Sequence, residues 1–288
     1  MDGETEMPTK AQPQEGDLPL AARPPVSVVI PVFNEEAVLM ANAEALASHF
    51  DDVLGSGNWF FIFVDNGSND GTPALLGRIV ARWPFSQVLN LKKPNYGAAL
   101  KTGLRTATTK WVYMLDIEQW DLPFMTWAWR NRHQYDLFVA SKRADPTLNF
   151  QRPYRKFLSA GLNAVLQLLF GYSGTDTHGP KLIDRESLEG IIAKCELDRG
   201  QFDTELVLRA IRGAKRLVEV PVEYRESRPH RNLMIKKIFW NLAALRRLWY
   251  VMREVPFEGQ IRYYRVARED VLAQLRLKPS GQRRSELV

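Results

Sequence analysis

The sequence has a single cysteine and no long hydrophobic run, and each absence excludes a class of protein. Cys195 is the only cysteine among 288 residues, which excludes an internal disulfide and a zinc site built from cysteines. A chain without disulfides suits a reducing compartment such as the cytoplasm. No apolar stretch approaches the ~20 residues of a membrane-spanning helix, and the acidic, polar start lacks the pattern of a signal peptide. We therefore expect any membrane association to be peripheral, at the cytoplasmic face.

Charge is distributed unevenly along the chain, whose formal net charge is +6. Residues 1–25 carry five acidic and two basic side chains, whereas residues 225–268 carry eleven basic and three acidic ones. A basic segment of this kind serves nucleic acid, anionic lipid or a phosphorylated substrate. Nucleic acid is the least favoured, because no known nucleic-acid motif is present and the aromatic residues lack the spacing of a stacking platform.

Short β-prone stretches alternate with helical ones from residue 26 onward. Such alternation predicts a doubly wound parallel sheet, in which ligands bind beyond the carboxyl ends of the strands. A helix predicted at 154–170 has apolar residues on most faces, so we expect it to be buried. The strands are predicted at residues 26–32, 59–64, 87–91, 111–115, 137–140, 181–183 and 216–222.

Two carboxylates follow one of these predicted strands at a spacing of one residue. If the strand continued through Asp116 and Glu118, their side chains would point the same way. Carboxylate oxygens at this spacing could hold Mg²⁺ or Mn²⁺ against a diphosphate. The same pair also fits a solvated loop at the end of a strand, so the neighbouring motifs decide between the two.

Several motifs stand in a characteristic order after the predicted strands. They are PVFNE at 31–35, VDNGSNDGT at 64–72, NYGAA at 95–99, DIE at 116–118, YRK at 154–156, TDTHGPK at 175–181, QFDTEL at 201–206 and VEVPV at 218–222. In this order they resemble the inverting family 2 glycosyltransferases of the GT-A fold. The resemblance is to the polyprenyl-phosphate branch, which includes dolichol-phosphate mannose synthases, and covers about residues 25–250.

The resemblance implies an α/β GT-A fold, which is a single Rossmann-like domain with a mostly parallel central sheet flanked by helices. We expect this catalytic domain at residues 25–230, after a disordered acidic tail at 1–24. Basic amphipathic helices are expected at 231–276, and a disordered tail at 277–288. The basic helices would contact a membrane surface, the domain itself or a sister subunit, because their apolar residues outnumber one helical stripe.

The resemblance also implies roles for individual residues at the strand ends. Asp65 would bind a nucleobase or ribose, although it also fits a turn-forming role, and Glu35 would contact the nucleotide or stabilise a helix N-terminus. Lys101 would approach a phosphate or lie exposed on its helix. The further substrate-binding residues expected from the motifs are Pro31, Phe33, Asn34, Asn66, Asp116, His178, Gln201 and Asp203.

Three positions depart from the pattern of the family. Glu118 and Asn66 stand where aspartates are usual, and His178 begins a His-Gly-Pro run in place of a small polar residue and Gly-Phe. Glu118 remains an oxygen ligand with a longer reach, so we expect altered metal geometry rather than loss of the metal. His178 is either a catalytic or phosphate-binding residue or a structural histidine.

The acceptor determines which further catalytic residues are needed. A lipid monophosphate is already ionised near neutral pH, since its second pKa is ~6, so it needs positive charge rather than a base. A sugar hydroxyl would need a carboxylate base, for which Asp176, Asp203 and Glu205 are candidates. The basic residues after the last predicted strand are Arg225, Arg228, His230, Arg231, Lys236 and Lys237, and Arg228 is our catalytic candidate among them.

These observations predict an inverting glycosyltransferase. It would move a hexose from a nucleoside diphosphate sugar, of the GDP-mannose or UDP-glucose type, to a polyprenyl or dolichyl phosphate with the help of Mg²⁺ or Mn²⁺. The alternatives are transfer to a soluble or glycan hydroxyl, and an inactive subunit that only binds nucleotide sugar. Partners would include a membrane surface and either a second copy or a separate membrane subunit, but not nucleic acid.

Overall fold

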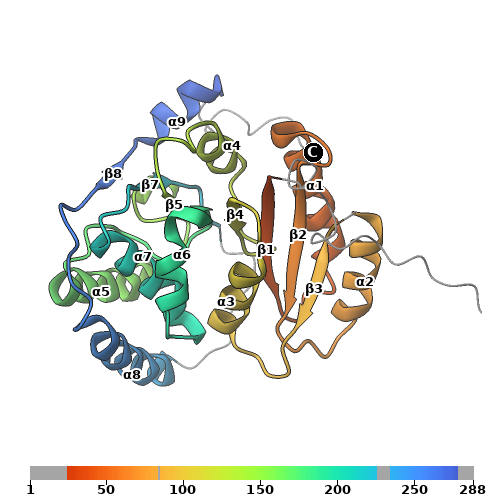
Figure 1. Ribbon diagram of the computed structural model, residues 1–288. Helices are drawn as coiled ribbons and strands as arrows, with labels where there is room; N and C mark the ends of the chain where they lie inside the picture. Colours follow the sequence, from red (N-terminus) through yellow and green to blue (C-terminus); the bar gives the residue numbers. More distant parts are fainter. Residues whose placement is uncertain (1–24, 84, 226–233, 278–288) are drawn as a thin grey trace, which may run out of the picture.

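The fold is built on one sheet with helices on both faces (Figure 1). The computed structural model describes residues 25–83, 85–225 and 234–277, and for 234–242 it describes the backbone alone. The strands are β1 (Val26–Val32), β2 (Trp59–Asp65), β3 (Gln87–Asn90), β4 (Trp111–Met114), β5 (Leu137–Ser141), β6 (Lys181–Asp184), β7 (Leu217–Pro221) and β8 (Tyr263–Arg265). The helices are α1 (Leu39–Leu54), α2 (Thr72–Arg82), α3 (Tyr96–Thr106), α4 (Leu122–Arg130), α5 (Pro153–Phe170), α6 (Arg185–Lys194), α7 (Phe202–Arg212), α8 (Met234–Met252) and α9 (Arg268–Leu275), with short 3₁₀ turns η3 (Pro146–Leu148) and η4 (Arg199–Gln201).

The strand order places one antiparallel strand inside an otherwise parallel sheet. The order is β3-β2-β1-β4-β6-β5-β7-β8, and β6 runs antiparallel to both β4 and β5. Because of this reversal Lys181, the first residue of β6, pairs with Met114, the last residue of β4. The loop that leads into β6 therefore lies at the same edge of the sheet as the carboxyl ends of β4 and β5.

Alternate residues of the central strands fill two hydrophobic cores, one on each face of the sheet. Val28 and Phe61 pack into the core covered by α1, α2, α4 and α9, whereas Val29 and Phe60 pack into the core beneath α3, α6 and α7. All four side chains have no exposed surface. Burial on both faces explains why β1 and β2 have near-continuous apolar sequences.

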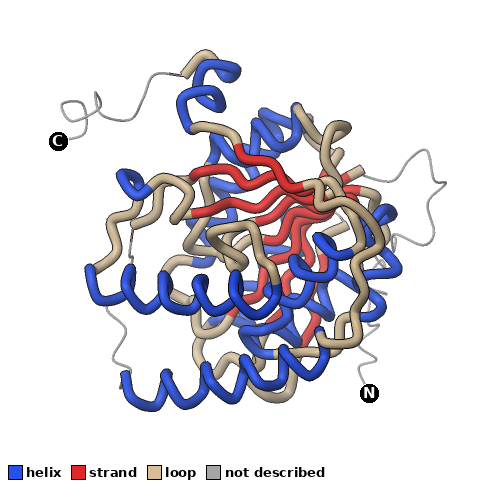
Figure 2. Tube along the Cα trace, turned by 90° about the vertical axis from the view of Figure 1, so that its left-hand side faces the viewer, coloured by secondary structure: helices blue, strands red, loops and turns tan. Residues whose placement is uncertain are grey.

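Helix α5 contradicts the expectation of a buried helix. Its buried residues are Asn163, Leu166 and Phe170, while Phe157 is 78% exposed and Leu168 is 84% exposed. The helix lies in the outer layer, where it contacts α8 (Figures 1 and 2). Apolar residues on most faces of a helix usually indicate burial, but here one apolar face remains open to solvent.

The C-terminal part of the described chain joins the main fold. Strand β8 pairs with β7, and Val271 and Leu272 of α9 are buried, Val271 in the core that α4 also covers. Strand β8 was not anticipated from the sequence. The predicted domain limits at residues 24, 230 and 276 stay predictions, and the tails at 1–24 and 278–288 lie outside the described residues. Among the helices of the described part, none is both long and apolar enough to cross a membrane.

Candidate active site

A first cavity of about 310 Å³ opens at the carboxyl ends of β1 and β4. It takes side chains from four of the predicted motifs, which are far apart in the sequence but follow neighbouring strands. Such a crevice is where open α/β sheets bind ligands. The first cavity is lined by Pro31, Val32, Phe33, Glu35, Asn66, Tyr96, Asp116, Ile117, Glu118 and Gln119.

Asp116 and Glu118 both line the first cavity, but they do not extend a strand. Strand β4 ends at Met114, and the backbone amide of Gln119 donates to the carbonyl of Asp116 at 3.1 Å, which closes a turn. The alternation of strand residues was therefore the wrong reason for placing the two carboxylates together. Their common position comes from this turn.

A neighbouring hydroxyl group forms a hydrogen bond with the Asp116 carboxylate. The Tyr96 hydroxyl donates to Asp116 Oδ1 at 2.9 Å. Burial raises the pKa of Asp116 above its ordinary value, and this hydrogen bond and the positive charge of Lys181 act in the opposite direction. The carboxylate is thus oriented by a tyrosine that the sequence analysis did not single out.

Asp116 and Glu118 suit a divalent cation that takes its remaining ligands from the substrate. In the described part of the chain there is no group of three or more histidine, cysteine, aspartate or glutamate side chains placed to hold a metal. Magnesium, however, is commonly bound by one or two carboxylates together with substrate phosphates. Asp116 and Glu118 supply that kind of oxygen ligand.

Most polar residues of the 64–72 motif build the loop rather than line the cavity. Asp65 Oδ1 accepts from the Ser68 amide at 3.0 Å, and Asn34 Oδ1 accepts from the Asn69 amide at 2.9 Å. Asn66 lines the first cavity and also accepts from the Asn95 amide at 2.6 Å. Gly67 has φ +81°, a left-handed conformation that favours glycine. The turn-forming role considered for Asp65 is therefore present.

Several predicted site residues lie outside the lining of the first cavity. Lys101 Nζ donates to the Glu196 carbonyl at 3.0 Å, and Gln201 ends the 3₁₀ turn η4. Glu205 is fully buried and accepts from the amides of Glu196 and Leu197 and from Arg209 Nε. The structure thus gives Lys101 and Glu205 structural partners.

Lys181 and Asp203 form a buried ion pair beneath Asp116. Lys181 Nζ lies 2.6 Å from Asp203 Oδ1, and the two side chains are 1% and 2% exposed. The ammonium also donates to the Gly179 carbonyl at 2.9 Å. Asp116, Tyr96 and this pair surround one void of about 10 Å³. Asp203, a candidate base from the sequence, is thus neutralised by a lysine and withdrawn from solvent.

Replacing Lys181 by methionine is expected to lower the free energy of unfolding by about 3–5 kcal/mol, because it leaves the Asp203 carboxylate buried without a counter-charge. Urea denaturation measures this change. The matched control is Lys110→Met. The Lys110 side chain is 48% exposed and pairs with Asp184 and Glu186, so its replacement should lower the free energy of unfolding by no more than about 1 kcal/mol. Equal losses in the two variants would contradict the assignment.

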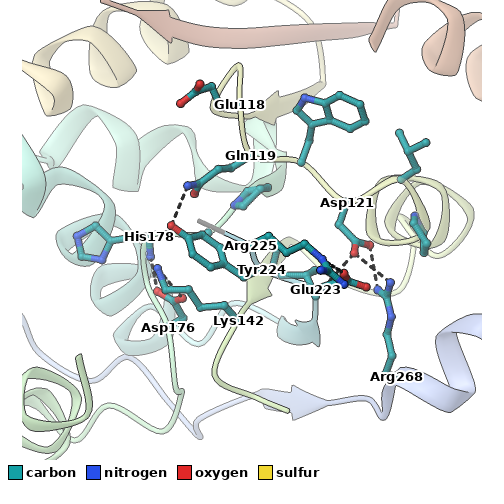
Figure 3. Close-up of a pocket in the computed structure, with 17 residues that line it drawn as sticks. Glu118, Gln119, Asp121, Lys142, Asp176, His178, Glu223, Tyr224, Arg225 and Arg268 are labelled. Atoms are coloured by element: carbon teal, nitrogen blue, oxygen red, sulfur yellow. Dashed lines mark hydrogen bonds and ion pairs between the residues drawn. The ribbon is translucent and has the colours of Figure 1, made fainter. Parts of the chain in front are cut away.

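A second cavity of about 440 Å³ adjoins the first (Figure 3). Glu118 and Gln119 line both, so the turn after β4 separates two spaces that meet at its tip. Gln119 Nε2 donates to the Tyr224 hydroxyl at 2.8 Å across the second cavity. The charged residues of its lining are Glu118, Asp121, Lys142, Asp176, Glu223, Arg225 and Arg268.

His178 lines the second cavity with both ring nitrogens engaged. Nε2 lies 2.8 Å from the Gly200 carbonyl, which can only accept, so Nε2 carries the proton and Nδ1 accepts from the Thr177 hydroxyl at 3.0 Å. The next residue, Gly179, has to be a glycine, because a Cβ at this position would lie 1.9 Å from the Ala140 carbonyl oxygen. The His-Gly pair thus allows this loop to lie directly against β5.

Asp176 is the base candidate that reaches the second cavity. Its Oδ1 accepts from the His178 amide at 3.0 Å. Its buried Oδ2 has no hydrogen-bond partner among the described residues, and Lys142 Nζ lies 3.9 Å away. Such an oxygen can still accept a hydrogen bond from a substrate.

A third cavity of about 80 Å³ lies between the loop after β5 and helix α5. Lys142 and Arg143 line it from the loop after β5, Asp176 lines it from the loop before β6, and Ser159 and Asn163 line it from α5. Arg143 Nε and Nη1 are buried there without a hydrogen-bond partner in the described part of the chain. A guanidinium with two buried N–H groups in this state favours an anion in the cavity.

Sequence reasoning missed Lys142 and Arg143, although a signal was present. The two residues directly follow β5, so the argument from strand ends that identified Asp65 applies to them equally. Of the predicted basic residues, Arg225 lines the second cavity, pairs with Glu223 at 2.6 Å and lies over the Phe150 ring. Arg228, His230 and Arg231, and the side chains of Lys236 and Lys237, lie outside the described residues.

Arg268 of α9 closes the far wall of the second cavity. Its guanidinium makes two hydrogen bonds with the Asp121 carboxylate, at 2.9 and 3.0 Å, and a third with the Pro221 carbonyl at 3.1 Å (Figure 3). Asp121 also caps α4 by accepting from the Phe124 amide. One carboxylate thus joins the turn after β4, helix α4 and helix α9.

Comparison with known proteins agrees with this arrangement. Residues 27–123 match the family described as glycosyl transferase family 2. The chain is 26% identical over 215 residues, 70% of its length, to dolichyl-phosphate beta-glucosyltransferase ALG5A of Trichomonas vaginalis, and it spans 66% of that relative, just under two thirds. It is 39% identical over 95 residues to undecaprenyl-phosphate 4-deoxy-4-formamido-L-arabinose transferase of Aeromonas hydrophila, covering 32% of this chain and 28% of the relative.

The fold is also found in a solved structure. Mannosyltransferase PcManGT of Pyrobaculum calidifontis, in complex with GDP-Man and Mn²⁺, superposes with a TM-score of 0.50 at 17% identity, over 89% of this chain and 69% of that one. The expected α/β GT-A fold is confirmed, as is the resemblance to the polyprenyl-phosphate branch. Residues 27–123 are similar to glycosyl transferase family 2, and the chain resembles the relatives named for dolichyl or undecaprenyl phosphate.

Proposed function

We propose that this protein is an inverting glycosyltransferase that moves a hexose from a nucleoside diphosphate sugar to a polyprenyl phosphate. The observation that carries the proposal is the meeting of two cavities at Glu118 and Gln119. One contains carboxylates suited to a cation, and the other leads to unpartnered positive charge at Arg143. This arrangement suits a reaction between two phosphorylated reactants that enter from opposite sides of one turn.

The first cavity is the proposed donor site. Asp116 and Glu118 would hold Mg²⁺ or Mn²⁺, which neutralises the charge that develops on the departing nucleoside diphosphate. Glu35 and Asn66, which line the same cavity, would contact the nucleotide. The names of the relatives favour glucose as the sugar, and the bound nucleotide sugar and Mn²⁺ of the mannosyltransferase support a metal-assisted donor site.

The second and third cavities are the proposed acceptor site. An ionised phosphate oxygen attacks without a base, so the protein has only to position it and balance its charge. Lys142 and Arg143 supply two cations at the carboxyl end of β5. Asp203 and Glu205 are bound to Lys181 and Arg209, so the proposal assigns neither of them the role of a base. A polyprenyl monophosphate is therefore the acceptor that this site suits best.

One observation favours a second candidate function. Asp176 Oδ2 lies buried beside the second cavity without a hydrogen-bond partner in the described part of the chain. A carboxylate in that state could remove the proton from a sugar hydroxyl. Transfer to a glycan hydroxyl, with Asp176 as the base, is the alternative that the experiment has to distinguish.

The test is an assay of the purified protein with UDP-glucose or GDP-mannose, a short-chain polyprenyl phosphate and Mg²⁺ or Mn²⁺. Release of nucleoside diphosphate and formation of lipid-linked sugar are both measured. The matched control is the polyprenol without its phosphate, and a second control adds EDTA. Product that requires the phosphate and the metal supports the proposal. Product with the alcohol or a glycan supports the second candidate, and donor binding without turnover would contradict both.

Tyr96→Phe is expected to raise the metal concentration for half-maximal activity by roughly 3–10-fold. The substitution keeps the ring but removes one hydrogen bond to Asp116, worth about 0.5–1.5 kcal/mol. Titration of Mg²⁺ at saturating substrates measures the shift. Tyr172→Phe, which loses a hydrogen bond to the Asp176 carbonyl instead, is the comparison variant. An unchanged metal requirement in Tyr96→Phe would show that the hydroxyl does not position Asp116.

A further inference from the structure

Strand β7 carries a carboxylate at its centre that the proposed reaction does not use. Glu219 has no exposed surface, whereas its neighbours Val218 and Val220 belong to the hydrophobic core on the other face of the sheet. A charged side chain is unfavourable to bury unless it is paired and hydrogen-bonded. The groups that bind Glu219 therefore indicate its role.

One oxygen of Glu219 binds the loop that leads into β6. The amide and the hydroxyl of Thr175 donate to Oε1 at 2.8 and 2.6 Å, and the amide of Asp176 donates to the same atom at 3.1 Å. These three hydrogen bonds fix two successive residues of the loop. The direction in which the Asp176 side chain leaves the backbone toward the second and third cavities is therefore fixed as well.

The other oxygen of Glu219 binds Arg265 of β8, the strand beside β7 at the edge of the sheet (Figure 1). Arg265 Nε donates to Glu219 Oε2 at 3.1 Å, and Arg265 Nη2 donates to the Ser173 carbonyl at 2.7 Å. The guanidinium thus balances the buried charge and binds the start of the same loop. The Arg265 side chain is 52% exposed, so it can be replaced with little effect on the core.

Hydroxyl groups connect Glu219 to the loop after β5. A carboxylate only accepts, so the Thr175 hydroxyl gives its proton to Glu219, and the Ser141 hydroxyl, 2.7 Å away, donates to Thr175. Ser141 Oγ in turn accepts from the amides of Arg143 and Ala144 at 3.2 and 3.0 Å. Glu219 thus sets the direction of the hydrogen bonds that end at the backbone of Arg143.

Fold stability alone does not account for this carboxylate. Replacing a buried ion pair by apolar side chains of similar volume is often neutral or stabilising, so an apolar residue at position 219 could fill the same space. An apolar side chain, however, cannot bind two amides and a hydroxyl. The carboxylate adds a fixed arrangement of two loops, and those loops carry Asp176 and Arg143, which line the third cavity.

We infer that Glu219 is a positioning residue of the acceptor site. It is not among the residues that line the three cavities, and it acts by holding the loops that carry Asp176 and Arg143. This inference rests on the proposed function, which assigns the third cavity to the acceptor phosphate. Loss of the carboxylate should therefore weaken binding of the acceptor and leave binding of the nucleotide sugar unchanged.

Steady-state kinetics of Glu219→Gln test the inference. Glutamine keeps the shape and one acceptor oxygen but loses the charge, so KM for the polyprenyl phosphate should rise roughly tenfold while KM for the nucleotide sugar stays the same. The matched control is Asp136→Asn. Asp136 is also a buried carboxylate that binds an amide and a guanidinium, both of Arg216, but it lies at the opposite end of β5. This control should leave both KM values unchanged.

Arg265→Gln tests the same contact from an exposed position, in case Glu219→Gln does not fold. It should raise KM for the acceptor by a smaller factor, about 2–5-fold, because an exposed partner contributes less. Hydrogen–deuterium exchange measures the loop directly. The amides of Thr175 and Asp176 should exchange faster in both variants than in the wild type.

The outcomes separate this inference from the proposed function. Unchanged exchange of these two amides would overturn the inference even if lipid-linked product forms. Faster exchange with an unchanged KM for the acceptor would also overturn it, because Glu219 would then have a structural role alone. A wild type that binds the polyprenyl phosphate without forming product would contradict only the proposed function, and the variants should then bind that lipid more weakly. A wild type that does not bind the lipid would contradict both.

Discussion

Asp116→Asn is expected to abolish glycosyl transfer, with kcat reduced by roughly three orders of magnitude. The amide keeps the shape of the side chain and its hydrogen bond with Tyr96, but it removes the negative charge that a cation in the first cavity would require. Charge stabilisation by a bound metal is worth several kcal/mol, and about 4 kcal/mol corresponds to this loss of rate. Initial rates at saturating metal, donor and acceptor measure it.

A matched control separates loss of chemistry from loss of fold. Asp51→Asn makes the same chemical change on α1, where the carboxylate accepts from Trp59 Nε1 away from both cavities, and it should leave the rate within about twofold. Asp116→Asn should unfold at the same temperature as the wild type or at a higher one, because burial opposes the charged form of Asp116 and raises its pKa, and the amide carries no charge. If Asp116→Asn kept a tenth of the wild-type rate, Asp116 would not be the metal ligand.

Arg143→Gln is expected to raise KM for the polyprenyl phosphate by roughly 10–100-fold while leaving KM for the nucleotide sugar unchanged. Nε and Nη1 of Arg143 are buried without partners in the described part of the chain, so a bound phosphate would gain charge-assisted hydrogen bonds that an amide replaces poorly. Hydrogen bonds to charged groups contribute about 1.5–3 kcal/mol, which gives this range.

The stability of Arg143→Gln provides an independent measure of the same feature. Removing a half-buried cation whose Nε and Nη1 lack hydrogen-bond partners in the described part of the chain should leave the free energy of unfolding unchanged or raise it in the absence of ligand. Arg130→Gln, at the exposed end of α4, is the matched control and should alter neither KM nor stability. An equal rise in KM for the donor and the acceptor would show that Arg143 does not act specifically on the acceptor, and would contradict the assignment of the third cavity.

The sequence allowed the cavity to be located because strand ends can be predicted from local patterns. Apolar, β-branched stretches identified β1, β2 and β4, and polar residues directly after them had to share one edge of a parallel sheet. Asp116 and Asn66 reached the first cavity for that reason. The turn at Asp116–Gln119 depends on a backbone hydrogen bond that no residue pattern announces.

Other assignments depended on the direction of side chains and on the one reversed strand. Lys101 lies on the predicted helix, but only the folded chain shows that its ammonium reaches the Glu196 carbonyl. The pairing of Lys181 with Asp203 follows from the antiparallel insertion of β6, which the alternation of strands and helices does not reveal. Helix α5 was expected to be buried, but Phe157 and Leu168 are exposed, because apolar composition alone does not say what the residues contact.

The contact between Arg268 and Asp121 has a consequence for the order in which the protein matures on the ribosome. Every residue that lines the first cavity lies between positions 31 and 119, whereas the wall of the second cavity requires a residue 147 positions after Asp121. Residues leave the ribosome in order from the N-terminus, and a domain folds as a unit. A growing chain therefore contains the residues for the nucleotide sugar long before Arg268 has been made, so the wall of the acceptor site can be completed only at the end of synthesis.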